Sequence, residues 1–216
     1  MKRLILLAVL SVTIFKFSNG QVSKINSDSL KPIQCLNQTN KNEELLAILD
    51  RIYQEDQKYR NQLEEIEKEF GEKSDEADSL WKIINEKDSL NQIIVKKILD
   101  EKGWLGIDVV GERGNSTLFL VIQHSDLASQ EKYLPMMRQA VKKGNAFAKD
   151  LAYLEDRVAL AKGKKQIYGT QIERNKETGE YYALPLIDPE NVDKRRAEMG
   201  LFPLEVYFAI IKQLDK

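Results

Sequence analysis

Residues 45–70 read LLAILDRIYQEDQKYRNQLEEIEKEF, and this stretch decides the fold of the front half of the chain. Its apolar residues recur in steps of three and four, and Asp56 is the one polar residue that occupies a place in the series. The series is Leu45, Leu49, Ile52, Tyr59, Leu63, Ile66 and Phe70. This spacing predicts one buried face along a single long helix, with Asn42 as its N-terminal cap.

A second helix follows after a short break at Gly71, where Ser74 or Asp75 provides the next cap. Its apolar stripe is less regular and ends before Gly103. The short connection predicts an antiparallel helical hairpin over residues 42–102. This segment holds 17 acidic and 10 basic residues, a net charge of −7, which we interpret as solvated helix faces.

Residues 103–216 have a different texture, with several glycines and a dense apolar run at 118–122. Periodicity alone allows a buried strand or the middle of a buried helix here, and Asn115 or Ser116 as a cap favours the helix. Further expected elements are helices over 129–143, 147–161, 192–199 and 204–214, and a β-hairpin from 166–172 and 181–184. The predicted fold class is mainly α, with an N-terminal antiparallel helical hairpin packed on, or leading into, a compact helical domain with one β-hairpin.

The first twenty residues have the pattern of a secretory signal peptide. Lys2 and Arg3 precede an apolar run over 4–15, and small residues come just before a cleavage point after Gly20. The run is shorter than the roughly 20 residues that a membrane span needs, although a short anchor is the alternative. We therefore expect an exported protein, periplasmic or extracellular, with a flexible lead-in over 21–41.

Composition excludes several classes of protein. The 216 residues include 33 basic and 34 acidic ones, so the basic excess typical of nucleic-acid binders is missing. Cys35 is the only cysteine, which rules out a scaffold of internal disulfides. The chain has only one histidine, without the paired-ligand spacing of known metal sites, so we predict no metal and no cofactor.

His124 is the one imidazole available for catalysis. Asp126, two residues later, or Asp156 is expected to orient the ring if it acts as a general base. Arg157 lies between apolar residues of a predicted helix and is expected to need a partner. We expect an ion pair of Asp126 with Arg157, or of Asp156 with Arg196. The more specific alternative is that the arginine binds an anion.

The stretch 166–171 offers polar groups around Gly169, and alternation would place Gln166 and Tyr168 on one strand face. Such a face is usually the wet side of a hairpin, but glycine inside a strand often marks a close approach of another group. The candidate ligand-binding residues are Arg157, Gln123, Gln166, Tyr168 and Gln171.

Several separated motifs together resemble a bacterial domain-of-unknown-function family, number six-six-two-four. They are Gly103-Trp104, Val110-Gly111-Glu112, Gln123-His124-Ser125-Asp126, Leu154-Glu155-Asp156-Arg157-Val158, Gln166-Ile167-Tyr168-Gly169-Thr170-Gln171, Val192-Asp193-Lys194-Arg195-Arg196 and Gly200-Leu201-Phe202-Pro203-Leu204. The resemblance covers roughly residues 95–214 and leaves the helical hairpin outside it. It implies one compact, mainly helical domain and transfers no mechanism.

Two functions remain open at this stage. The first is a non-catalytic exported module that binds a small polar or anionic ligand, or a protein partner, near the β-hairpin. The alternative is a hydrolase that uses His124 as general base, oriented by Asp126 or Asp156. A homodimer through the helical hairpin is a further possibility, whereas no nucleic-acid partner is expected, nor a membrane span after signal cleavage.

Overall fold

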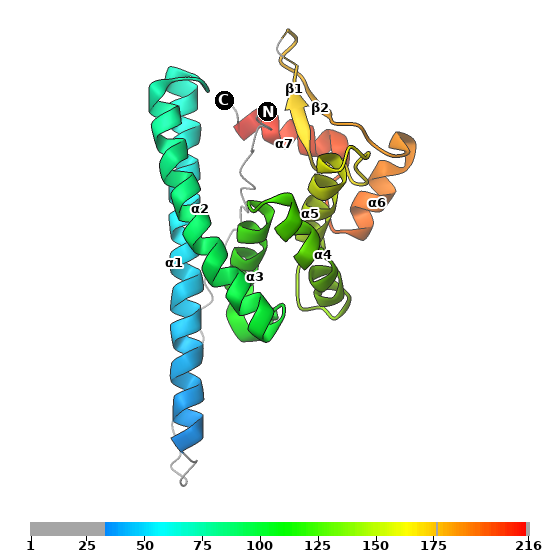
Figure 1. Cartoon of the computed structure of the whole chain (residues 1–216). Coiled ribbons are helices and arrows are strands. Elements are labelled where there is room, and N and C mark those ends of the chain that lie inside the picture. The colour runs from blue at the N-terminus through cyan, green and yellow to red at the C-terminus, as the bar shows by residue number, and fades with distance from the viewer. Residues whose placement is uncertain (1–32, 176, 215–216) are drawn as a thin grey trace, which may run out of the picture.

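A computed structural model describes residues 33–175 and 177–214. Seven α-helices and one two-stranded sheet make up this part of the chain (Figure 1). The elements are α1 (Ile33–Phe70), α2 (Asp75–Lys102), α3 (Ile107–Gln123), α4 (Leu127–Lys142), α5 (Ala148–Ala161), β1 (Ile172–Arg174), β2 (Tyr181–Ala183), the 3₁₀ turn η1 (Pro189–Asn191), α6 (Val192–Glu198) and α7 (Leu204–Leu214). The predicted fold class, mainly helical with one β-hairpin, is confirmed.

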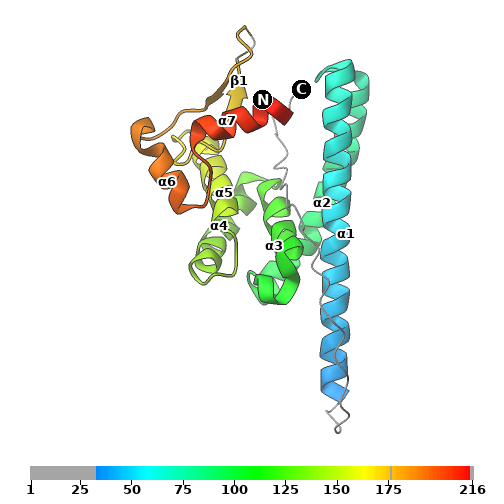
Figure 2. The same cartoon turned by 180° about the vertical axis from the view of Figure 1, so that it is seen from behind.

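Helices α1 and α2 form the antiparallel hairpin that the apolar spacing predicts (Figures 1 and 2). Gly71 adopts a positive φ of 93° between them, and the Ser74 hydroxyl accepts a hydrogen bond from the Ala77 amide at the start of α2. Near this end of the hairpin a separate small core joins the two helices, and its buried residues are Leu63, Ala77, Leu80 and Ile84. Helix α1 begins at Ile33, so Asn42 does not cap it and residues 33–41 are helical, contrary to the expected lead-in. Pro32 stands immediately before this start, a position where proline favours a helix.

Helix α3 lies at the centre of the molecule and packs against α1, α2, α4 and α5. Its run Leu118–Ile122 is buried at every position, which is why its sequence shows no polar side and why it could not be told from a buried strand. The helix starts before the predicted cap. Asn115 is buried and its side-chain amide donates to the Leu105 and Asn145 carbonyl oxygens, so it does not cap the helix.

The sheet is shorter than the sequence pattern predicts. Strands β1 and β2 pair antiparallel, with Ile172 opposite Ala183. The predicted strand over 166–172 is wrong except at its last residue, because residues 166–171 form a loop that runs over the end of α5. Gly169 has a φ of 68° in this loop, and a side-chain carbon there would meet Leu204 Cδ1 at 3.2 Å.

The C-terminal end of the described chain lies beside the turn of the helical hairpin. Helix α7 reaches from the β-hairpin toward the turn between α1 and α2 (Figures 1 and 2), where Lys68 Nζ lies 3.4 Å from the Leu214 carbonyl oxygen. Lys68 also pairs with Glu64, one turn earlier on α1, at 3.0 Å. Among the described helices, none combines the length and apolarity that crossing a membrane requires.

Candidate functional site: a histidine and arginine cluster between the hairpin and the domain

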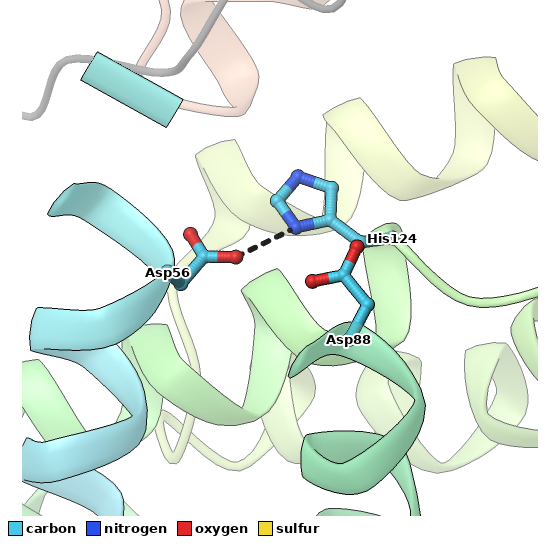
Figure 3. Close-up of side chains that lie close together, drawn as sticks. All are labelled: Asp56, Asp88 and His124. Atoms are coloured by element: carbon cyan, nitrogen blue, oxygen red, sulfur yellow. Dashed lines mark hydrogen bonds and ion pairs between the residues drawn. The ribbon is translucent and has the colours of Figure 1, made fainter. Parts of the chain in front are cut away.

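His124 follows the last residue of α3, and its side chain faces the long hairpin (Figure 3). Its Nδ1 lies 3.2 Å from Oδ1 of Asp56, which comes from the middle of α1. A carboxylate can only accept a hydrogen bond, so Nδ1 carries the proton and Nε2 of the neutral ring holds the lone pair. No described residue forms a hydrogen bond with Nε2, which points away from the carboxylates of Asp56 and Asp88 in Figure 3.

Arg60 ties the two carboxylates of this cluster together. Its Nε donates to Asp56 Oδ1 at 2.9 Å, and its Nη2 donates to Asp88 on α2 at 2.9 and 3.0 Å. Burial alone would raise the pKa of Asp56, but the hydrogen bonds and charges of His124 and Arg60 hold it well below its ordinary value. Asp56 is therefore ionised at neutral pH, and the hairpin presents a fixed acceptor to the ring of His124.

The electrostatics keep His124 neutral. Burial lowers the pKa of its imidazole, and the positive charge of Arg60 lowers it further, while Asp56 and Asp88 only partly offset these effects. The side chain of His124 is 7 % exposed, so the ring meets solvent over a small part of its surface. A neutral histidine with its proton fixed on Nδ1 offers Nε2 as a base or as a hydrogen-bond acceptor.

Arg157, on α5, is a partly buried cation for which no described residue provides a partner. Its Nε is buried and has no hydrogen-bond partner, and none of the described acidic residues forms an ion pair with its guanidinium group. Burial, together with the like charge of Arg60, lowers the pKa of Arg157 to about 10. The expected pair with Asp126 is not formed. A positive charge withdrawn from water without a counter-ion is unfavourable.

Asp56, Asp88 and His124 also satisfy the first requirement of a metal site, because one ligand atom from each lies within 4.8 Å of the others. Arg60, however, already occupies the space and the lone pairs that a cation would need, at 2.9 Å from both carboxylates. A divalent ion would have to displace a guanidinium group that is itself held between two acids. The donor set therefore fits an internal salt-bridge network better than a metal centre.

Asp126 does not orient His124. Its carboxylate caps α4 by accepting from the Ser129 amide at 2.8 Å and hydroxyl at 3.0 Å, and it lies 3.6 Å from Lys96 Nζ at the surface. The cap explains an aspartate at this place, because the first amides of a helix lack partners within the helix.

Asp156 also does not orient His124, because its carboxylate binds the backbone of the loop 166–171. Its Oδ1 accepts from the Ile167 and Tyr168 amides, and its Oδ2 accepts from the amide and hydroxyl of Thr170 at 2.9 Å. The carboxylate thus holds the loop 166–171 against α5. The expected pair with Arg196 is not formed, since that arginine instead donates to the carbonyl oxygens of Phe202 and Tyr168.

The remaining predicted ligand residues belong to the same loop or to the core. Gln166 is fully buried and donates to the carbonyl oxygens of Gln171 and Leu184, while the Gln171 side chain donates to the Thr170 hydroxyl. Tyr168 is half-buried, and burial together with Glu155 raises its pKa to about 12. Gln123 is buried beside His124 in sequence, with no partner for its Oε1. No contact among these residues joins the loop to the histidine cluster, so the structure does not gather the predicted set into one site.

Sequence reasoning missed Asp56, Arg60 and Asp88, although the first left a signal. Asp56 fills an apolar place in the series along α1, and Arg60 lies one turn further along the same face. A charged residue at a position that must be buried needs a buried partner. That partner could not be named, because His124 lies 68 residues away in the sequence.

Comparison with known proteins gives a family match that includes the hairpin. A model described as a family of unknown function, DUF6624, matches residues 40–215, and so includes Asp56, Arg60 and Asp88 as well as His124 and Arg157. The narrower limit of roughly 95–214 is therefore wrong at its start. No curated protein and no solved structure matches the chain. The match over most of its length shows that the chain belongs to the family of unknown function DUF6624.

Proposed function

We propose that this protein is a binding module for a small anionic ligand, and that the ligand pairs with Arg157. The observation that supports the proposal is the buried Nε of Arg157, which has no partner in the described chain. Arginine offers a planar set of donors that matches carboxylate and phosphate groups. The free energy lost by burying this charge would be recovered when an anion binds.

Arg60 and His124 complete the proposed binding site, which we call the Arg157 site. Arg60 uses Nε and Nη2 for Asp56 and Asp88, and no described residue accepts a hydrogen bond from its Nη1. The charge of Arg60 contributes to the lowered pKa of Arg157 and to the lowered pKa of His124. The site would thus combine groups from α1, α3 and α5, and ligand binding would hold the hairpin to the domain.

Titration of the full chain with acetate, sulfate and inorganic phosphate, followed by NMR or calorimetry, tests this proposal. We expect saturable binding of at least one of these anions, and loss of that binding in Arg157→Met. Arg51→Met is the matched control, because Arg51 is an exposed arginine on α1. Binding that survives Arg157→Met, or no binding of any of the three anions, would refute the proposal.

A hydrolase remains the second candidate, supported by the pair of His124 with Asp56 at 3.2 Å. In this reaction Nε2 of His124 would take the proton from an attacking water, and Asp56 would stabilise the imidazolium that forms. The orienting acid is then Asp56, not Asp126 or Asp156. Hydrolysis of activated esters and phosphodiesters should fall by at least about a hundredfold in His124→Gln. Equal rates in wild type and variant would exclude this role.

Self-association through the hairpin stays a prediction. We now assign it to a smaller part of the hairpin surface, the outer side of α2. The residues of the heptad series around Leu49 and Ile52 are buried within the chain itself. The outer side of α2 carries the exposed residues Ile83, Leu90 and Ile93, whose spacing places them along one stripe. Light scattering of wild type and Leu90→Lys tests it: a concentration-dependent dimer in wild type alone supports this stripe, and a monomer throughout excludes it.

We propose export from the sequence of residues 1–20. These residues lie outside the described part of the chain, as does the side chain of Cys35. The positive residues, the apolar run and the small residues before Gln21 support cleavage after Gly20. Mass spectrometry of the chain recovered from a secretion-competent bacterial host tests this point. A mature chain that begins at Gln21 is expected, and an intact N-terminus would refute cleavage.

A further inference from the structure

The outer side of α2 carries an apolar seam that no described part of the chain covers. Residues of the inner side of the helix, such as Ile84 and Val95, are buried within the chain. On the outer side Ile83, Leu90 and Ile93 are 41, 58 and 68 % exposed. They follow one another in steps of seven and three residues, which is the spacing of the seam between two helices of a coiled coil. A seam of this kind, left exposed, indicates a surface for a partner helix.

Two residues of opposite charge occupy further places in the seam. Glu86, which is exposed, lies four residues before Leu90. Lys97 lies four residues after Ile93, and its side chain is 74 % exposed. The two charged residues are therefore equally far from the midpoint between Leu90 and Ile93, with the acid on one side and the base on the other.

A second copy of α2 matches this arrangement when it runs in the opposite direction. A two-fold axis at the midpoint brings each place in the seam opposite the place equally far on the other side. Leu90 of each copy then packs against Ile93 of the other, and Glu86 of each copy lies beside Lys97 of the other. In a parallel pair equal residues face each other, so Glu86 would meet Glu86, and like charges brought together at an interface are unfavourable.

From this symmetry we infer that the chain forms a two-fold antiparallel dimer through α2, with Leu90 packed against Ile93 and Glu86 paired with Lys97 in both halves of the interface. The inference rests on the self-association proposed for the hairpin and adds its orientation and register. One register satisfies the apolar contacts and the charges together, which is the feature that identifies a second copy of the chain as the partner.

The outer end of the seam is compatible with this register. It places Ile83 of one copy level with Asp100 of the other, and a carboxylate that pointed into the seam would oppose the contact. Asp100 is instead held to one side by α4. Its carboxylate accepts a hydrogen bond from the Tyr133 hydroxyl at 3.0 Å and lies 2.8 Å from Lys132 Nζ.

Charge reversal in the full chain tests the inference, with the dimer dissociation constant measured by sedimentation or light scattering. Glu86→Lys and Lys97→Glu should each weaken the dimer by about tenfold, because two attractive contacts become repulsive. The double variant Glu86→Lys/Lys97→Glu exchanges the charges and should restore the wild-type affinity. Glu44→Lys is the matched control, because Glu44 is an exposed acid on α1, outside the seam, and should leave the affinity unchanged.

Mixing the two single variants separates a loss of pairing from a loss of folding. Together they should form a mixed dimer of about wild-type affinity, since every charge contact in it is attractive again. Full affinity in both single variants, or a double variant that stays as weak as they are, would overturn the orientation and register and leave self-association standing. A wild-type chain that is monomeric at every concentration would overturn self-association and this inference together.

Discussion

Replacing Arg157 with methionine should stabilise the ligand-free protein. Methionine keeps most of the apolar stem of the side chain and removes the buried charge. The fall of the Arg157 pKa to about 10 corresponds to a penalty of about 3 kcal/mol for keeping the guanidinium charged in the fold. Because the folded pKa is the lower one, this penalty is fully present at all pH values below about 10 and is relieved as the pH rises above that value.

Part of this gain is lost with the van der Waals contacts of the guanidinium group. We therefore expect the free energy of unfolding to rise by about 1–3 kcal/mol in Arg157→Met, which for a chain of this size raises Tm by about 2–10 °C. Urea denaturation at pH 7, without added anions, measures the change. An anion at a hundredfold excess over Kd should remove most or all of this difference, because it stabilises wild type by about 2.7 kcal/mol and leaves the variant unchanged.

Arg60→Met is the contrasting variant in the same cluster. It removes the cation that contacts both Asp56 and Asp88, and should destabilise the protein by about 3–5 kcal/mol. The reasoning fails if Arg157→Met destabilises the protein by an amount similar to Arg60→Met. That result would show that Arg157 already has a counter-ion within the folded chain, and that no ligand is needed to pair with it.

Three further substitutions probe the neighbouring polar groups. Asp56→Asn should lower the pKa of His124 further, because the carboxylate is the main group that raises it, and histidine NMR against pH measures this directly. Asp150→Asn should stabilise the protein at pH 8 but hardly at pH 4, because burial raises the pKa of Asp150 to about 7. The unfolded chain releases this proton at a lower pH than the folded protein does, so the free energy of unfolding of wild type falls as the pH rises toward 7. A stability difference that does not depend on pH would contradict this assignment. Asp156→Asn should lower the free energy of unfolding by about 2–4 kcal/mol, because hydrogen bonds from the loop amides to a charged carboxylate are lost. Amide exchange in the loop 166–171 should become faster, and unchanged exchange at Thr170 would refute this role.

Periodicity in the sequence was sufficient for most of the helices. The heptad series predicts α1 and the hairpin, and the apolar spacing predicts α4, α5 and α7 close to their observed limits. Helices α1, α4 and α5 each bury one side against the same core, which gives their sequences a helical period. The start of α1 and the loop 166–171 were placed wrongly. The loop was read as a strand because its alternation is real, but the alternation reflects side chains and amides gathered around Asp156.

The composition of the histidine cluster depended on the tertiary structure. Proximity in sequence favours Asp126 as the partner of His124, yet α4 begins at that point and uses the carboxylate as its cap. The partner is Asp56, because folding of the hairpin along α3 brings the middle of α1 beside the end of α3.

The sequence by itself determined that the chain forms a long amphipathic hairpin followed by a helical domain, since helix formation follows from local spacing and caps. It also showed that Arg157 lies between apolar residues and needs a partner, and that Asp56 interrupts the apolar series of α1. Only the tertiary structure decided that Asp56 finds its partners inside the protein while Nε of Arg157 finds none. Pairing between charges depends on distance in space, and the packing of α1, α3 and α5 fixes those distances.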